Sequence, residues 1–226
     1  MNTADVTTFL QPDDVQPQFL ASRQKELLGL LEKGVFQITN IQDVPPGARV
    51  FGSRFVDEIK AKGTDKAFEK SRLVVQAYND DQKTTVLTQS PTIQRMSQRL
   101  LLCIAAMKLD TSTGLYLRDI SQAYVQSITK LNREFYVRPP RELANQLGIE
   151  KDSVLRVVKP LYGVPEAGNH WFRTYHNHHV QELHMNASTY DPCLLYTNQN
   201  AFGIVGLQTD DTLFLANTAF AKAEQE

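Results

Sequence analysis

Near its C-terminus the chain reads Phe202-Gly203-Ile204-Val205-Gly206-Leu207-Gln208-Thr209-Asp210-Asp211-Thr212-Leu213-Phe214-Leu215, and this stretch decides the fold class. Apolar residues flank the acidic pair Asp210-Asp211 on both sides. Short apolar segments around a turn signal predict two largely buried strands of one hairpin. The two carboxylates are therefore expected at the tip of that hairpin. Asp is also a common turn residue, because its side chain bonds nearby backbone amides, so the pair alone leaves a purely structural role open.

A third acid ends another apolar segment. The residues Leu115-Tyr116-Leu117 predict a strand that delivers Asp119 at its C-terminal end, although an acid there can also serve only to cap the following helical turn. Two such strand ends can lie side by side in one antiparallel sheet. Three converging carboxylates would repel each other unless cations lay between them, and Mg²⁺ favours oxygen ligands. Two metal ions about 3.5–4 Å apart can stabilise the attacking and leaving oxygens of phosphoryl or nucleotidyl transfer.

Helices and hairpins alternate along the rest of the chain. Helices are expected at residues 17–33, 90–107 and 166–184, and a helical turn at 121–126. The predicted apolar faces are Leu20, Leu27, Leu28 and Leu31 in the first helix, and Ile93, Met96, Leu100, Ile104 and Met107 in the second. Strands are expected at residues 35–41, 50–60, 72–78, 115–118, 134–137, 154–158, 193–197, 202–208 and 213–216. Helices mixed with mostly antiparallel hairpins predict an α+β fold.

Composition places the chain among intracellular globular proteins. Its 226 residues suffice for one large domain or two small ones, and 42% hydrophobic with 22% charged residues is ordinary for a folded domain. The longest clean apolar run, 100–107, is too short to span a membrane, and residues 1–5 show no basic stretch followed by an apolar one that would indicate a secretory signal. Two cysteines ninety positions apart match no metal spacing. We therefore expect a cytoplasmic or nuclear protein that is not secreted and has no membrane partner.

Charge is balanced overall but not locally. The net charge of −1 excludes a protein that coats nucleic acid by bulk charge. Between residues 49 and 72, however, seven basic residues face four acidic ones along a predicted hairpin, which indicates either a solvated face or a contact surface for phosphates. All five histidines lie between His170 and His184. Only His176 and His179 share a helical face, so a polar helix surface is favoured over a zinc site.

Several motifs occur in the order found in one known family. They are Leu30–Phe36, Phe55–Lys60, Lys70–Val74, Arg118–Tyr124, Phe135–Pro140, Leu161–Ala167 with Trp171, and Leu207–Asp211. In these motifs the chain resembles the reverse transcriptase domain of Ty1/copia-type retrotransposon polyproteins, over residues 27–217. It departs from the family pattern at Phe55, where Trp is usual, at Glu166, where Gln is usual, and at Gln208-Thr209, where Tyr-Val is usual.

The resemblance implies a role for each matching residue. Asp119 and Asp210 would be the main ligands of two Mg²⁺ ions, with Mn²⁺ as a substitute and Asp211 beside them. Tyr124 would crowd the 2′ position of the sugar and so favour deoxynucleotides; the alternative is a tyrosine of the core. Lys70 and Arg72 would hold the incoming triphosphate, the alternative being a solvated strand face. Glu166 would lie near the nucleotide, where an anion is electrostatically unfavourable.

The resemblance also implies the architecture and the activity. It predicts a right-hand polymerase-like fold in which fingers (about 17–94 and 127–164) and an incomplete palm (about 95–126 and 165–226) follow a loose lead-in at 1–16. The palm sheet would be antiparallel with helices packed on one face, and a thumb and an RNase H domain are expected to be absent. The implied activity is RNA-directed DNA synthesis on an RNA or DNA template with a primer and deoxynucleoside triphosphates.

Two alternatives to this activity stay open. One is a catalytically inactive retroelement remnant that keeps the fold and weak nucleic-acid binding. The other is a different two-metal phosphotransferase or nuclease that uses the same acids. Because the chain is short after Asp211, we expect it to polymerise poorly by itself. The sequence does not indicate an oligomeric state.

Overall fold

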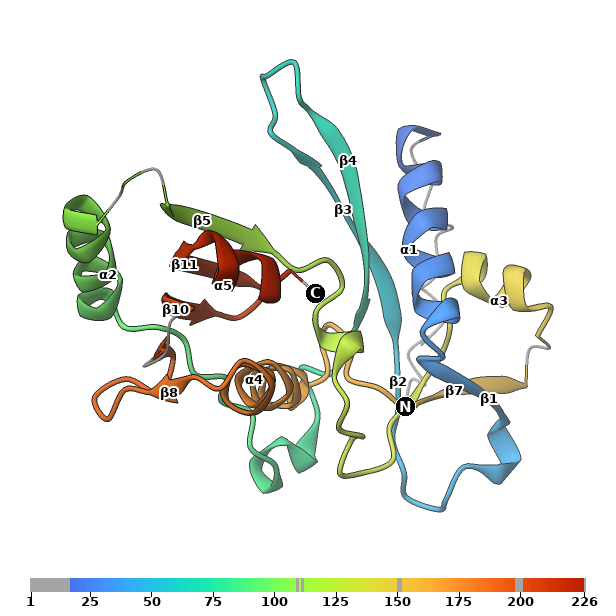
Figure 1. The fold of residues 1–226 in the computed structure, drawn as a ribbon. Coiled ribbons are helices and arrows are strands. Elements are labelled where there is room, and N and C mark those ends of the chain that lie inside the picture. Colours follow the sequence, from blue (N-terminus) through green and yellow to red (C-terminus); the bar gives the residue numbers. More distant parts are fainter. Residues whose placement is uncertain (1–16, 109, 111, 150–151, 198–200, 226) are drawn as a thin grey trace, which may run out of the picture.

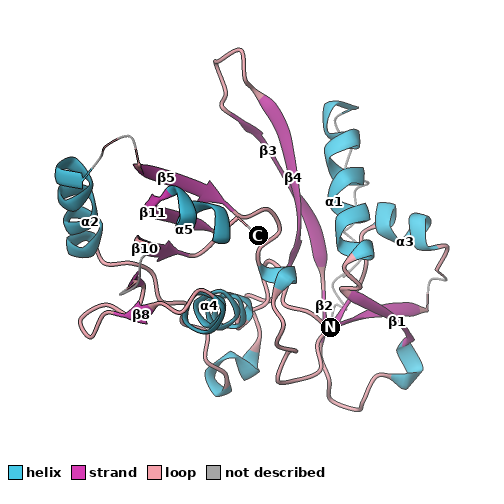
Figure 2. Cartoon of the chain, viewed as in Figure 1, coloured by secondary structure: helices cyan, strands magenta, loops and turns pink. Residues whose placement is uncertain are grey.

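The chain folds into an α+β structure, as its pattern predicts (Figures 1 and 2). A computed structural model describes residues 17–108, 110, 112–149, 152–197 and 201–225, so the predicted lead-in at 1–16 lies outside the described residues. The α-helices are α1 (Leu20–Glu32), α2 (Arg95–Lys108), α3 (Arg141–Leu147), α4 (Ala167–Asn177) and α5 (Thr218–Ala223). One turn of π-helix, His178–Glu182, continues α4, and short 3₁₀ turns lie at Pro17–Phe19, Ile41–Asp43, Asp81–Thr85 and Tyr124–Gln126. None of the described helices has the length and apolar content needed to cross a bilayer.

The strands form two sheets and a separate hairpin. They are β1 (Phe36–Asn40), β2 (Val50–Phe51), β3 (Ser53–Lys60), β4 (Phe68–Val75), β5 (Thr113–Asp119), β6 (Tyr136–Val137), β7 (Ser153–Val157), β8 (Asn186–Ala187), β9 (Leu194–Tyr196), β10 (Gly203–Gln208) and β11 (Asp211–Asn217). The five-stranded sheet has the order β5-β11-β10-β9-β8 and is antiparallel throughout. The four-stranded sheet has the order β1-β7-β6-β2, with β2 and β6 parallel.

Helices cover both faces of the five-stranded sheet, whereas the sequence predicted helices on one face. Successive residues of a strand point to opposite faces. Phe214 of β11 is buried among residues of α4 and α5, such as Trp171 and Phe220, while its neighbour Leu215 is buried against Leu101 of α2. The alternation of large apolar residues on β11 therefore requires cover on each side.

A second core lies under the four-stranded sheet and the hairpin. It joins Leu27 and Leu30 of α1 to Leu73 and Val75 of β4 and to Leu155 of β7. The β3–β4 hairpin is paired only with itself, and its tip extends beyond the other elements in Figure 1. α1 packs beside β4. The hairpin is thus fixed at its base and along one side.

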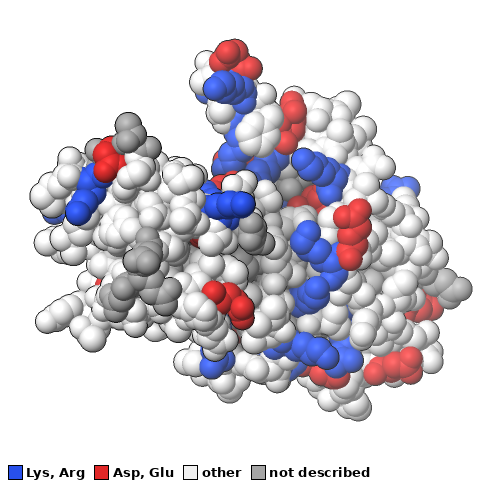
Figure 3. Space-filling model, in the orientation of Figure 1, with Lys and Arg blue, Asp and Glu red and all other residues white. Residues whose placement is uncertain are grey.

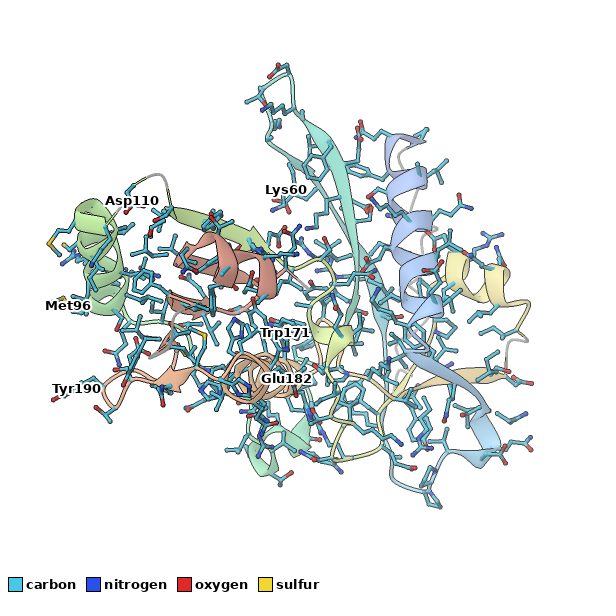
Figure 4. All side chains as sticks on the ribbon, in the orientation of Figure 1. Lys60, Met96, Asp110, Trp171, Glu182 and Tyr190 are labelled. Carbon is cyan, nitrogen blue, oxygen red and sulfur yellow. The ribbon has the colours of Figure 1, made fainter. Side chains whose placement is uncertain are left out.

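Two predicted helix faces are wrong in detail. In α1 the buried residues are Arg23, Glu26, Leu27 and Leu30, whereas Leu20 and Leu28 are exposed. In α2 the buried residues are Ser97, Leu101 and Ala105, whereas Met96, Leu100 and Met107 are exposed, and Figure 4 shows Met96 on the outer side of the helix. α2 also begins at Arg95 rather than Ser90, because the preceding segment is extended and Ile93 donates its backbone N–H to Leu207. In both helices polar and small residues take part of the buried face, which apolar periodicity does not detect.

Candidate active site

Backbone pairing brings the three predicted acids to one end of the five-stranded sheet. β5 ends at Asp119, β11 begins at Asp211, and these two residues are direct partners in the antiparallel register. Asp210 lies in the turn before β11, where its carbonyl oxygen accepts a 2.9 Å hydrogen bond from the backbone N–H of Ile120. Directly opposed residues in such strands have Cβ atoms about 4.5–5.5 Å apart. The register therefore places Asp119 beside the acidic pair, as the strand ends predicted.

The turn that carries Asp210 is anchored from two sides. Thr209 has φ +56°, a left-handed conformation that β-branched residues rarely adopt. Its carbonyl oxygen accepts a 2.7 Å hydrogen bond from the indole Nε1–H of Trp171, which lies on the side of α4 that faces the sheet (Figure 4). Gln208 accepts a 2.6 Å hydrogen bond at Oε1 from Nε2 of Gln98 on α2. Gln208 and Thr209, which stand where the resembled family has Tyr-Val, thus fix the turn to α2 and α4.

Repulsion among the acids affects the protonation of Asp211. Burial raises the pKa of Asp211 above its ordinary value, and the carboxylates of Asp210 and Asp119 raise it further. The ammonium group of Lys70 acts in the opposite direction and lowers this pKa. The four side chains therefore lie within electrostatic reach of each other, and a cation placed among the acids would relieve their repulsion.

The donor chemistry of the three acids fits a hard divalent cation. Carboxylate oxygens are the ligands that suit Mg²⁺ and Mn²⁺. Within the described part of the chain, no group of three or more His, Cys, Asp or Glu side chains is arranged to hold a metal ion. The three acids are neighbours in the sheet and carry oxygens of the kind that bind these ions, but their side chains are not arranged as a three-ligand metal site.

A cavity of about 740 Å³ has Asp119 in its wall. The cavity is bounded by α1, by β4 and by the segment that follows β5. Lys70 and Arg72, two positions apart on β4 and so on the same side of the strand, line this same cavity. In Figure 3, Lys and Arg side chains gather along the hairpin and around its base. Of the three predicted acids, Asp119 shares this cavity with Lys70 and Arg72, whereas Asp210 and Asp211 do not line it.

Two tyrosines, Tyr124 and Tyr162, lie near the acids and near Arg72. The rings of Tyr124 and Tyr162 have centroids 4.8 Å apart, and the guanidinium of Arg72 lies 5.8 Å from the centroid of Tyr162. Burial, and secondly the negative charge of Asp210, raises the pKa of both hydroxyls, that of Tyr162 to about 12. Tyr162 lines the cavity. Both tyrosines are therefore neutral at physiological pH and lie close to the acidic turn.

Tyr162, Gln122 and Glu26 are among the cavity-wall residues that the sequence did not identify as part of the site. Gln122 has φ +52° and donates a 2.8 Å hydrogen bond from Nε2 to Oε2 of Glu26 on α1. Glu26 also accepts a hydrogen bond of 3.3 Å from the backbone N–H of Leu73 on β4. Gln122 lies in the motif Arg118–Tyr124 and Tyr162 in the motif Leu161–Ala167, and this position is the sequence feature that could have identified them as site residues. Glu26 gave no signal, because its partners lie far along the chain.

Glu166 lies elsewhere. Its side chain is 1% exposed and accepts two hydrogen bonds from Arg133, of 3.0 Å from Nε and 2.9 Å from Nη2. Arg133 also donates to Asp80. Burial raises the pKa of Asp80, but the hydrogen bonds from Arg133 and the Gln82 backbone N–H, with the charges of Arg133 and Arg49, together lower it below its ordinary value. Glu166 does not line the cavity that holds Asp119. The ion pair with Arg133 therefore gives a structural reason for an acid at this position.

The histidine cluster is not a polar helix surface. His170 and His179 are buried, and Nδ1 of His179 lies 2.9 Å from the carbonyl oxygen of Tyr175. Burial lowers the pKa of His179 to about 4, so the ring is neutral at physiological pH. The ring of His179 meets the ring of Tyr175 edge-on, and the Tyr175 hydroxyl lies 2.9 Å from Oγ1 of Thr212 on β11, whereas Nδ1 of His170 lies 2.7 Å from the hydroxyl of Thr129.

Comparison with known proteins identifies the class. A family model described as reverse transcriptase (RNA-dependent DNA polymerase) matches residues 36–222. The truncated transposon Ty1-A Gag-Pol polyprotein of Saccharomyces cerevisiae is 28% identical over 171 residues, which cover 74% of this chain and 13% of that polyprotein. The transposon Ty1-DR4 Gag-Pol polyprotein of the same organism is also 28% identical over 171 residues, 74% of this chain and 10% of its own length.

The chain therefore belongs to the reverse transcriptase (RNA-dependent DNA polymerase) family. Within that family it is similar to Ty1/copia-type retrotransposon polyproteins, as the motifs predicted. It spans only about a tenth of the length of these two relatives. No solved structure matches the chain significantly.

Proposed function

We propose that the chain carries a nucleotidyl-transfer centre for RNA-directed DNA synthesis. One observation carries this proposal. Asp119, which is paired with Asp211 across the sheet, shares a cavity with Lys70 and Arg72. One of the acids that could hold a divalent cation and two cationic groups that could bind phosphate therefore face one space. That combination suits a deoxynucleoside triphosphate and the 3′-hydroxyl of a primer.

The proposal assigns a separate role to each group of side chains. Asp119 and Asp210, with Asp211 beside them, would hold divalent cations, Mg²⁺ or Mn²⁺, which when bound stabilise charge on the attacking and leaving oxygens. Lys70 and Arg72 would donate charge-assisted hydrogen bonds to the triphosphate and orient it. The primer 3′-oxygen would then bond to the α-phosphorus while the bond to diphosphate breaks. Tyr124 would contact the sugar of the nucleotide near its 2′ position.

The fold supports a matching assignment of subdomains. The β3–β4 hairpin and the four-stranded sheet would form the fingers (about 17–94 and 127–164), and the five-stranded sheet would form part of a palm (about 95–126 and 165–226). This assignment is supported by the acids at the end of the five-stranded sheet and by the basic hairpin beside them. Template, primer and nucleotide would then lie between the hairpin and the sheet.

Primer extension tests the proposal. An oligo(dT) primer on a poly(rA) template is incubated with dTTP and the full chain, with Mg²⁺, with Mn²⁺ and with EDTA. We expect slow extension that requires the metal and is lost in Asp119→Asn and in Asp210→Asn. Asp43→Asn is a matched control, because it makes the same substitution at an exposed 3₁₀ turn away from the cavity.

The outcomes separate the alternatives. Extension that survives Asp119→Asn would refute the assignment of the acids. Template-primer binding without extension, in Mg²⁺ and in Mn²⁺, would support the alternative of a catalytically inactive remnant that retains nucleic-acid binding. If Asp43→Asn reduces primer extension as much as Asp119→Asn does, the loss of one negative charge anywhere in the protein explains the reduction.

A further inference from the structure

A second cavity lies apart from the acids. Its volume is about 320 Å³, and it is formed by the loop 127–131 and by the C-terminal end of β7 with the two residues that follow. The basic residues Lys130, Arg133, Arg156 and Lys159 line it, and none of the other described residues in its wall is acidic. A concave surface lined by cations alone is suited to an anion.

Two of these four cations have no carboxylate partner. Arg133 is paired with Asp80 and Glu166, and Arg156 is paired with Glu134 at 2.9 Å. Lys130 and Lys159 make no ion pair with any residue that the structure describes. The cavity therefore keeps two uncompensated ammonium groups.

A buried hydroxyl adds a neutral donor to the cavity wall. Ser127 is 4% exposed and lines the cavity, yet its Oγ has no hydrogen-bond partner among the described residues. Buried polar atoms usually find a partner, and one left without a partner is costly. A bound oxyanion near this wall would offer acceptors both to the hydroxyl and to the ammonium groups.

The walls of the two cavities are continuous along the chain. The segment that lines the first cavity at Ser121 and Gln122 runs on to the second cavity at Ser127, and Ser127 donates its backbone N–H to the carbonyl of Tyr124 at 3.1 Å. Likewise, Lys159 in the second cavity is three residues before Tyr162 in the first. Two short chain segments therefore connect the walls of the two cavities.

We propose that the second cavity is a phosphate-binding site, and that it takes a backbone phosphate of the nucleic-acid strand that occupies the first cavity. The phosphate chemistry follows from the cationic lining alone. The choice of a nucleic-acid strand rests on the proposed function. Lys130 and Lys159 supply the charge, and the Ser127 hydroxyl supplies a donor.

Binding of a single-stranded oligonucleotide at several salt concentrations tests this inference. For a single strand, the slope of log K against log salt changes by about 0.7 for each phosphate contact. We expect the double variant Lys130→Ala/Lys159→Ala to bind several-fold more weakly and to show a slope shallower by about 0.7 or more. The control Lys83→Ala/Lys222→Ala removes the same charge from exposed positions outside both cavities and should keep the wild-type slope. Equal effects of the two double variants would overturn the proposal.

A second pair of variants tests the cavity without removing a cation. Ile128 is exposed at the cavity wall, so Ile128→Glu places a carboxylate there without disturbing the core. We expect it to weaken oligonucleotide binding, whereas Ile38→Glu, at an exposed position of β1 outside the cavity, should not. No difference between the two would count against the site.

Titration with inorganic phosphate, followed by amide chemical shifts of residues 127–131, distinguishes the source of the phosphate. Shifts that an oligonucleotide competes away would support a backbone phosphate. Shifts that persist in saturating oligonucleotide would overturn the assignment to a strand and indicate a site for free phosphate. The proposed function is tested by metal-dependent extension and its loss in Asp119→Asn, whereas this inference is tested by the salt slope of Lys130→Ala/Lys159→Ala, so the two failures give different results.

Discussion

Replacing Glu166 with glutamine should destabilise the protein and leave its affinity for nucleotide unchanged. Glu166 is buried, and its carboxylate accepts hydrogen bonds from Nε and Nη2 of Arg133. A glutamine keeps one acceptor, but its amide group would turn an N–H toward the second N–H of Arg133. The variant Glu166→Gln therefore loses one charge-assisted hydrogen bond.

The structure sets the size of this loss. A hydrogen bond to a charged group contributes about 1.5–3 kcal/mol to the free energy of unfolding. We expect a value toward the lower end, because Arg133 keeps its bonds to Asp80 and so is not left unpaired. By contrast, Arg133→Met removes the ion-pair partner that two buried acids share and should cost about 3–5 kcal/mol.

Urea unfolding at pH 7 measures both variants. The matched control is Glu134→Gln, which makes the same substitution in an exposed ion pair with Arg156 at 2.9 Å. Exposed pairs contribute about 0–1 kcal/mol. If Glu166→Gln lowers the unfolding free energy no more than Glu134→Gln does, the buried pair is not the reason for an acid at this position. A change in the KM for dTTP without a change in stability would show that Glu166 acts on the nucleotide instead.

Three further changes test other parts of the structure. Gly163 has φ +88°, and an added Cβ would lie 2.0 Å from the carbonyl oxygen of Val75. Gly163→Ala should therefore lower the free energy of unfolding by about 2–4 kcal/mol. The control Gly148→Ala also has a positive φ but no atom within 4 Å of the added Cβ, so it should lower this free energy by about 1–2 kcal/mol. Burial lowers the pKa of His179 from 6.5 to about 4, so on acidification the unfolded chain binds this proton before the folded protein does. The free energy of unfolding should therefore fall by about 3 kcal/mol between pH 6.5 and 4. Urea unfolding should show a shallower fall in His179→Gln, whereas the control His184→Gln, at an exposed position, should keep the wild-type fall. The pKa of Asp211 is raised in the folded protein, so its negative charge opposes folding at neutral pH. Asp211→Asn should therefore raise the free energy of unfolding at pH 7 by about 0.2–1 kcal/mol. Thermal unfolding at several pH values should show that this gain shrinks as the pH falls toward 3.8.

The sequence predicted the acidic end of the sheet because local signals and pairing agree there. Short apolar segments that end in acids define strands whatever their partners are, and antiparallel pairing of β5 with β11 then opposes Asp119 and Asp211. The hairpin β3–β4 and helix α1 were predictable for the same reason, since their turns and ends carry clear residue signals.

Other features depend on contacts between distant residues. Arg133 is 33 residues from Glu166 and 53 from Asp80, so no local pattern indicates their ion pairs. The apolar residues of α2 that are buried, Leu101 and Ala105, are selected by contact with Leu215 of β11, far along the chain, and not by apolar spacing in the helix alone. The cavity beside α1 requires Glu26 to meet Gln122 across 96 residues. Such arrangements follow from the packing of whole elements.

The hydrogen bond between Trp171 and the acidic turn gives the protein an intrinsic optical reporter. Trp171 is the one tryptophan among the 226 residues, so all indole emission comes from a ring bonded to the carbonyl group next to Asp210. The ring is buried and stacked on Tyr175 with centroids 5.0 Å apart. A cation or a nucleotide that shifts the turn would change the environment of this one ring. Unlabelled protein can therefore report occupancy of the acidic end of the sheet through the wavelength and intensity of its fluorescence.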